Sequence, residues 1–78
     1  MPGRGYMQEA VGAVLTHCFT TLGIHRVEAE IEPGNVRSAR LAERLGFQRE
    51  GLLRERLFVA NEPRTVQMYS LLRSEWRL

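Results

Sequence analysis

The sequence places an Asn and a Ser three residues apart, at Asn35 and Ser38, directly after a Pro-Gly pair. Asn is a favoured N-cap residue, because its side-chain oxygen accepts a hydrogen bond from a free backbone N–H at the start of a helix. One interpretation is therefore that Asn35 caps a surface helix and that Ser38 lies in its first turn. The alternative is that both side chains face a ligand lying against the start of that helix.

A second candidate site precedes the first apolar stretch, where Gly3, Arg4 and Gly5 lead into Tyr6 and Met7. Free backbone N–H groups at the beginning of a helix, together with the positive end of its dipole, bind anions, and glycines allow a phosphate to approach the backbone. These residues are consistent with an anion site or with a flexible terminus, and taken alone they leave both open.

Metal binding and serine hydrolysis find little support in the sequence. The soft metal ligands are His17, Cys18 and His25, and because their spacing matches no zinc pattern we expect no metal. No Gly-x-Ser-x-Gly motif marks a serine nucleophile. The single Cys cannot form an internal disulfide, which fits a reduced, cytoplasmic compartment.

The residues around these candidates predict the elements that would hold them. Apolar residues recur at helical spacing over residues 6–22, and Gly23 follows as a stop. A strand with one buried face is predicted over residues 24–32, because apolar and charged residues alternate there. A second helix is predicted over residues 36–45, and Gly46 would end it.

Two further strands are predicted in the second half of the chain. An extended run covers residues 47–59, with Gly51 as an expected bulge or point of close backbone approach, and residues 64–72 are β-prone after a turn at 60–63. The predicted order is helix, strand, helix, strand, strand, which belongs to the α/β class. A chain of 78 residues holds one small domain and buries roughly 60% of its unfolded surface.

The composition is that of an ordinary globular domain with a small positive charge. No apolar run approaches the ~20 residues that cross a bilayer, and no apolar segment follows Met1 as it would in a signal peptide. All 11 basic residues are Arg, all nine acidic residues are Glu, and the formal net charge is +2. The planar guanidinium group of Arg binds phosphate and carboxylate through two parallel hydrogen bonds, although codon usage also produces such a bias toward Arg. Because the charges are dispersed along the chain, we expect no nucleic-acid partner, and because no apolar run is long enough we expect no membrane partner.

Three blocks that follow one another in order resemble a known family and cover essentially the whole chain. They are GRGYMQEA, HRVEAEIEPGNVRSARLAERLGFQREGLLRE and YSLLRSEW. They resemble the C-terminal half of a GNAT-superfamily N-acetyltransferase, in the branch that includes the ribosomal-protein N-terminal acetyltransferases. The resemblance implies a partial GNAT-like fold, with a small mixed sheet packed by two helices and without the family's N-terminal strands. It also implies that residues 1–78 are a single acetyl-CoA-binding half of an acetyltransferase domain.

The same resemblance implies roles for both candidate sites. Backbone N–H groups of residues 3–7 would bind the pyrophosphate of acetyl-CoA, Asn35 would contact the pantetheine arm, and Ser38 would stabilise the departing thiolate. Ala42 stands where many members carry a Tyr as general acid, which leaves that duty to Ser38 or water. Thr65 stands where this branch often has Asp.

The activity implied is acetyl transfer from the co-substrate acetyl-CoA to an amine, either a protein N terminus or a small amine. The general base and the acceptor residues often come from the family's N-terminal half, which has no counterpart in these residues. A catalytically silent fragment that only binds CoA or only oligomerises is therefore the alternative. The first strand would expose an edge that invites pairing with another chain, and we expect a homodimer.

Overall fold

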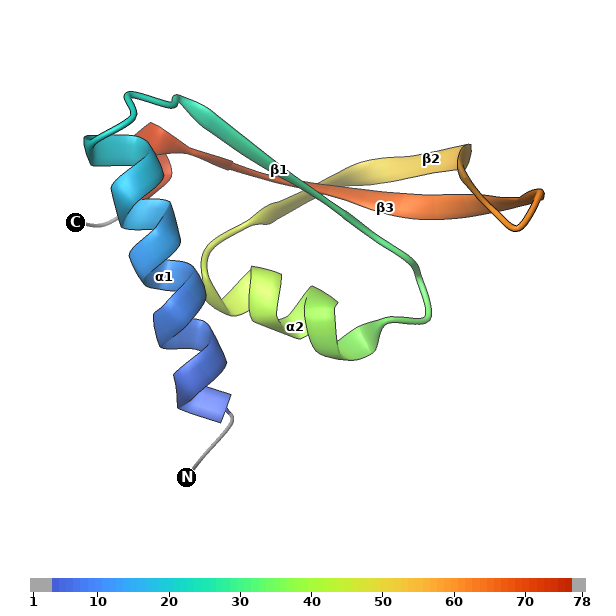
Figure 1. The fold of residues 1–78 in the computed structure, drawn as a ribbon, viewed down its shortest axis with the longest axis horizontal. Helices are drawn as coiled ribbons and strands as arrows, with labels where there is room; N and C mark the ends of the chain where they lie inside the picture. Colours follow the sequence, from blue (N-terminus) through green and yellow to red (C-terminus); the bar gives the residue numbers. More distant parts are fainter. Residues whose placement is uncertain (1–3, 77–78) are drawn as a thin grey trace.

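The computed structural model describes residues 4–76, and it confirms the predicted order of elements (Figure 1). For residues 4–6 the description covers the backbone. The elements are α1 (Arg4–Thr20), β1 (Arg26–Ile31), α2 (Val36–Arg44), β2 (Gln48–Val59), β3 (Glu62–Leu72) and the short 3₁₀ helix η1 (Arg73–Glu75).

The three strands form one antiparallel sheet in the order β1-β3-β2. The central strand β3 pairs with β1 along residues 67–72 and with β2 along residues 62–70. The mixed sheet implied by the family resemblance is therefore not seen in the described residues. The reason is that β1 and β2, which run in the same direction, are separated by β3, which is antiparallel to both.

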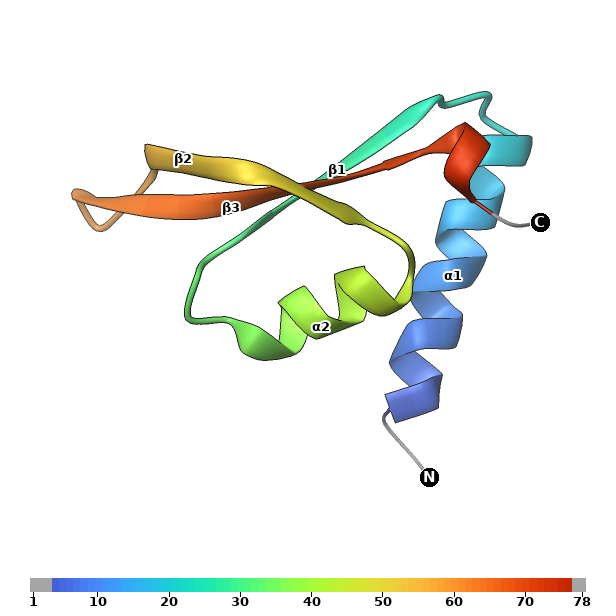
Figure 2. The same cartoon turned by 180° about the vertical axis from the view of Figure 1, so that it is seen from behind.

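Both helices lie on the same side of the sheet (Figures 1 and 2), and one hydrophobic core fills the space between them. Its buried members are Leu15, Phe19, Ile31, Ala42, Leu45, Phe47, Tyr69 and Leu71. Trp76 closes one edge of this core. The centroid of its ring lies 6.4 Å from that of Phe19, and its indole N–H donates a hydrogen bond to Thr16 Oγ1 at 3.0 Å. The core thus joins α1 to the last residues that the structure describes.

Helix α1 differs from the prediction at its start and in its burial. It begins at Arg4 rather than at residue 6, so that two residues expected to precede the helix belong to its first turn. Leu15 and Phe19 are buried, whereas Met7 and Val14 are more than half exposed, because the described residues cover only one side of the helix. No helix in the described residues is long and apolar enough to cross a membrane.

The turns follow the predicted chemistry, with one correction. Gly46 adopts a left-handed φ of 97° after α2, and Gly51 lies at a shift in the β2–β3 register, which confirms the expected stop and bulge. The β2–β3 turn is tighter than predicted. Because Ala60 and Asn61 both have positive φ, 51° and 67°, a two-residue turn lets β3 begin at Glu62 instead of residue 64.

Candidate functional site

The turn between β1 and α2 holds Asn35 and Ser38 in the geometry of a capped helix. The Asn35 Oδ1 accepts a hydrogen bond from the Ser38 backbone N–H at 3.1 Å, which confirms the capping interpretation. The backbone N–H of Asn35 donates to the Glu32 carbonyl at 2.9 Å, closing the turn at Pro33 and Gly34. These bonds fix Asn35 and Ser38 together at the start of α2.

An open groove of about 610 Å³ lies beside this turn, so capping and a ligand site do not exclude each other. Both Asn35 and Ser38 line it, and its walls come from the strands as well as from the turn. The lining residues are Glu30, Ile31, Glu32, Gly34, Asn35, Ser38, Leu57 and Val66. The structure therefore brings two predicted site residues onto one concave surface with apolar and acidic neighbours.

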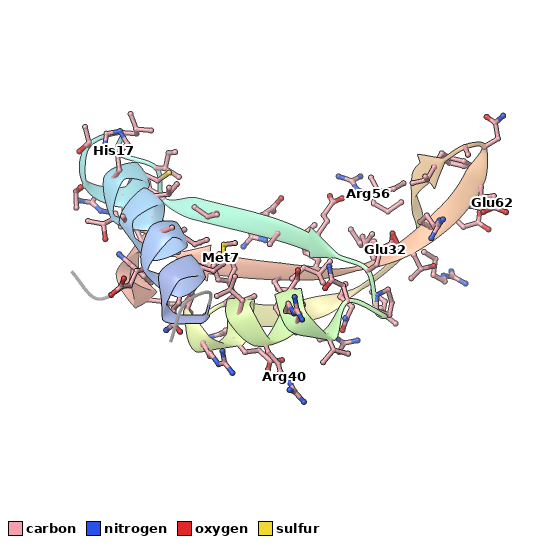
Figure 3. All side chains as sticks on the ribbon, turned by 60° about the horizontal axis from the view of Figure 1, so that its bottom comes forward. Met7, His17, Glu32, Arg40, Arg56 and Glu62 are labelled. Atoms are coloured by element: carbon pink, nitrogen blue, oxygen red, sulfur yellow. The ribbon has the colours of Figure 1, made fainter. Side chains whose placement is uncertain are left out.

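Two carboxylates in this groove, Glu30 and Glu32, were not singled out by the sequence. Each is held by an arginine from another strand: Arg56 Nε lies 3.1 Å from Glu30, and Arg64 Nη1 lies 3.3 Å from Glu32. Figure 3 shows Glu32 and Arg56 near the end of β1. Alternation along β1 indicated their polar face, but which arginines meet them depends on the strand order. In residues 4–76 no group of three His, Cys, Asp or Glu side chains could hold a metal ion.

The predicted anion site is described in part. Gly3 lies outside the described residues, while Arg4, Gly5, Tyr6 and Met7 form the first turn of α1. The first N–H groups of a helix have no intrahelical partner, so this turn offers backbone donors. It contains no acidic residue, which would repel an anion.

The two predicted sites lie near opposite ends of α2. Gln8, close to the start of α1, lines a cavity of about 330 Å³ with Arg44 and Leu45 at the C-terminal end of α2. Asn35 and Ser38 lie at the N-terminal end of the same helix. Because nine helical residues rise by roughly 13 Å, only an extended ligand would reach both sites.

The two positions that depart from the family pattern lie away from the groove. Ala42 is buried in the core with 6% of its surface exposed, and its methyl group cannot donate a proton. Thr65 lines a wider depression of about 860 Å³ beside the bulged part of β2, where its Oγ1 accepts from the Glu55 N–H at 3.5 Å. This depression contains none of the predicted site residues, so its size does not make it the candidate site.

Glu50, whose carboxyl group has a strongly lowered pKa, lies outside the groove. The Arg26 guanidinium donates two hydrogen bonds to Glu50, at 2.7 and 3.2 Å, and Ser70 Oγ donates a third at 2.7 Å. These bonds, those from Arg26 first, lower the pKa of Glu50 to about 2, and Glu50 and Glu28 in turn raise the pKa of Arg26. Because the group links all three strands and does not line the groove, its low pKa reflects a structural ion pair rather than a catalytic base.

Residues 1–48 match the family model described as an acetyltransferase (GNAT) domain, and the chain belongs to this family. The uncharacterised N-acetyltransferase p20 of Bacillus licheniformis is 40% identical over 74 residues, which cover 95% of this chain and 42% of p20. The ribosomal protein uS5-alanine N-acetyltransferase of Escherichia coli is 35% identical over 74 residues, covering 95% of this chain and 38% of that protein.

A solved structure gives the same result for the fold. The ribosomal-protein-S5-alanine acetyltransferase from Vibrio fischeri matches with a TM-score of 0.86 at 27% identity, over 99% of this chain and 42% of that chain. The GNAT resemblance and the partial GNAT fold are thereby confirmed. The chain spans about two fifths of the length of these relatives.

Proposed function

We propose that this chain is the acetyl-CoA-binding part of a GNAT N-acetyltransferase, which transfers an acetyl group from a thioester to an amine. The observation that carries the proposal is the groove at the β1–α2 turn, where an amide, a hydroxyl and two carboxylates share one open surface. Acetyl transfer to an amine requires a group that takes the amine's proton, donors for the tetrahedral oxyanion and a partner for the departing thiolate. The groove holds groups of the right chemistry for these steps.

Each group in the groove has a role that its chemistry favours. Ser38 is the candidate for stabilising the thiolate, because a hydroxyl can donate a hydrogen bond to it. Asn35 uses Oδ1 in the cap, and its amide N–H groups are the candidate donors to a pantetheine carbonyl. Residues 3–7 are the candidate pyrophosphate site, since a helix start favours an anion. Glu30 and Glu32 are the candidate bases for the amine.

The acceptor that we propose is a protein N terminus. Support comes from the relative named for the alanine of ribosomal protein uS5, and a small amine is the alternative. The cytoplasm is the compartment that suits such an acceptor and the free thiol of Cys18. Because the chain spans about two fifths of its relatives, the competing proposal is a catalytically silent fragment that binds CoA without turnover.

Thermal unfolding in the presence of CoA tests the binding proposal. A ligand that binds only the native state at a hundredfold excess over Kd stabilises it by about 2.7 kcal/mol. We expect CoA to protect the chain, and pantetheine, which lacks the pyrophosphate, to protect it much less. Equal shifts with the two ligands would overturn the pyrophosphate site, and no shift with either would overturn CoA binding.

Release of free CoA thiol from acetyl-CoA in the presence of an amine separates the enzyme from the silent fragment. If thiol is released, Ser38→Ala should lower kcat more than it weakens acetyl-CoA binding, because thiolate stabilisation is felt mainly in the transition state. Ser74→Ala, at an exposed position in η1, is the matched control and should leave kcat unchanged. Binding without thiol release would favour the silent fragment, and an unchanged kcat for Ser38→Ala would make Ser38 structural.

We also propose that the chain forms a homodimer through β1. Among residues 4–76 this strand is paired with β3 along one edge, and an unpaired strand edge attracts another chain. The exposed side chains of Met7, Val14 and Leu22 add apolar surface nearby in the sequence. Sedimentation equilibrium at micromolar concentration should detect a dimer. A folded monomer with slow amide exchange along residues 26–31 would contradict the proposal.

A further inference from the structure

Three arginines form a stripe along the outer face of α2. Arg37, Arg40 and Arg44 are three and seven residues apart, so that they fall within roughly 60° of the helix circumference. All three are exposed, while Ala42 and Leu45 face the core. Figure 3 shows Arg40 pointing away from the rest of the domain. We call these three side chains the arginine stripe.

The arginine stripe has no acidic partner among the ion pairs of the described residues, a property that it shares with Arg49, Arg54 and Arg73. Every ion pair found among the described side chains involves Arg26, Arg56 or Arg64, which all lie on strands. With three arginines and one glutamate, α2 has a net charge of +2, which equals the formal net charge of the whole chain. Folding therefore neutralises part of the charge within the sheet, and it leaves three arginines without a carboxylate partner next to one another on one helix face.

We infer that the arginine stripe binds the phosphodiester backbone of RNA, a partner that the dispersion of charges along the sequence did not predict. Guanidinium forks match phosphate geometry, and the three side chains extend over roughly 10 Å of helix, enough to meet successive phosphates of one strand. The choice of RNA over DNA rests on the proposed acetylation of ribosomal-protein N termini, whose surroundings are rich in RNA. The phosphate-binding face itself does not depend on that proposal.

An anionic membrane is a poorer match for this surface. A helix that lies in a membrane interface needs a large exposed apolar face beneath its basic residues. The apolar face of α2 is already used by the core, through Ala42 and Leu45. The remaining face of α2 is basic and polar, apart from the exposed Val36, which suits a phosphate backbone better than acyl chains.

The arginine stripe and the groove occupy different sides of α2. Ser38 lies roughly 100° or more around the helix from each of the three arginines. A ligand in the groove and a nucleic acid on the stripe would therefore contact different side chains. Arg44 also lines the cavity beside the start of α1, so CoA bound at the candidate pyrophosphate site would compete with RNA for this one arginine.

Fluorescence anisotropy with a labelled, mixed-sequence 20-nucleotide single-stranded RNA tests the inference on the 78-residue chain. If three phosphates are neutralised, a plot of log Kobs against log salt concentration should have a slope of about −2. Replacing all three arginines (R37Q, R40Q and R44Q together) should weaken binding at least tenfold and bring the slope close to zero. Gln is a good helix former, and circular dichroism would check that α2 persists.

The matched control removes three exposed arginines elsewhere (R49Q, R54Q and R73Q together) and changes the net charge by the same amount. We expect less than a twofold loss of RNA affinity for this control. Equal losses in the two triple variants would overturn the inference, because net charge alone would then explain binding. Tighter binding to phosphatidylserine vesicles than to RNA would also overturn it. Failure of CoA binding with RNA binding retained would count against the proposed function and leave this inference standing.

Discussion

The two ends of the sheet contain similar residues in very different surroundings. At one end β1 flanks β3 and both helices cover the sheet, and there Leu71 of β3 and Phe19 of α1 have no exposed surface. At the other end β2 and β3 continue alone as a hairpin arm, residues 57–64, which extends away from the helices (Figures 1 and 2). In this arm Phe58 is 68% exposed and Val59 is 47% exposed. The comparison teaches that a strand's apolar residues become core only where a third strand and a helix cover them.

The largest expected effect is at the covered end. Phe19→Ala should lower the free energy of unfolding by about 3–5 kcal/mol, because it removes a fully buried aromatic ring and leaves a cavity beside Trp76. Since the free energy of unfolding of a small domain is only about 5 kcal/mol, much of the variant should be unfolded at 25 °C. Urea denaturation followed by circular dichroism measures this. A loss below 1 kcal/mol would show that the covered end is not the stability centre.

A smaller gain in stability is expected at the tip of the arm. Ala60 adopts a left-handed φ of 51°, which costs a residue with a β-carbon about 1 kcal/mol, whereas Asn tolerates this region. Ala60→Asn should therefore stabilise the chain by about 0.5–1 kcal/mol in thermal unfolding. Ala60→Val is the opposite control and should destabilise it, because a branched β-carbon fits a left-handed residue poorly. The same stability for both variants would mean that the arm does not contribute to the folding equilibrium.

The pH dependence of stability should reveal the ion pair on the covered half of the sheet. The pKa of Glu50 is about 2 in the folded chain, below the ordinary carboxyl value of 4.5. Its contribution to stability is therefore fully present above about pH 4.5 and is lost as the pH falls toward 2. The free energy of unfolding of the wild type, measured by denaturation, should therefore fall over this pH window more than that of Glu50→Gln. Arg26→Gln removes the cause of the low pKa and should flatten the curve similarly; an unchanged curve would contradict the pairing.

The smallest effect is expected for the exposed ring of the arm. Phe58→Ser should change the free energy of unfolding by less than about 0.5 kcal/mol, as surface substitutions usually do. The same urea experiment used for Phe19→Ala measures it, so the pair of variants gives the contrast directly. A loss above 1 kcal/mol that depends on protein concentration would show that another chain covers the arm.

Local sequence was sufficient for the elements and for part of the site. Pro33-Gly34 and Gly46 marked the limits of α2, and alternation marked β1, because turn chemistry and periodicity act between neighbouring residues. The capping role of Asn35 followed from the same local rules. Spacing also placed Ser38 beside it. The start of α1 and the tight Ala60–Asn61 turn were less well predicted, since helix ends and turn types depend on a few backbone angles.

The contacts of the groove required the folded structure. Arg56 and Glu30 are 26 residues apart, and Arg64 and Glu32 are 32 residues apart, so no periodic pattern relates them. These pairs form because β1 and β2 both flank β3 in one sheet. This strand order is one of several possible pairings between segments that are distant in the sequence.

The sequence by itself determined the identity and order of the helices and strands, the cap at Asn35 and the position of three arginines on one helix face. Only the tertiary structure decided which charges would be neutralised. Arg26, Arg56 and Arg64 found carboxylates across the β1-β3-β2 sheet, while Arg37, Arg40 and Arg44, like Arg49 and Arg54 on β2, found none in the described residues. The physical reason is range: helix faces follow from neighbours three and four residues apart, whereas ion pairs between strands form only after distant segments have been brought together.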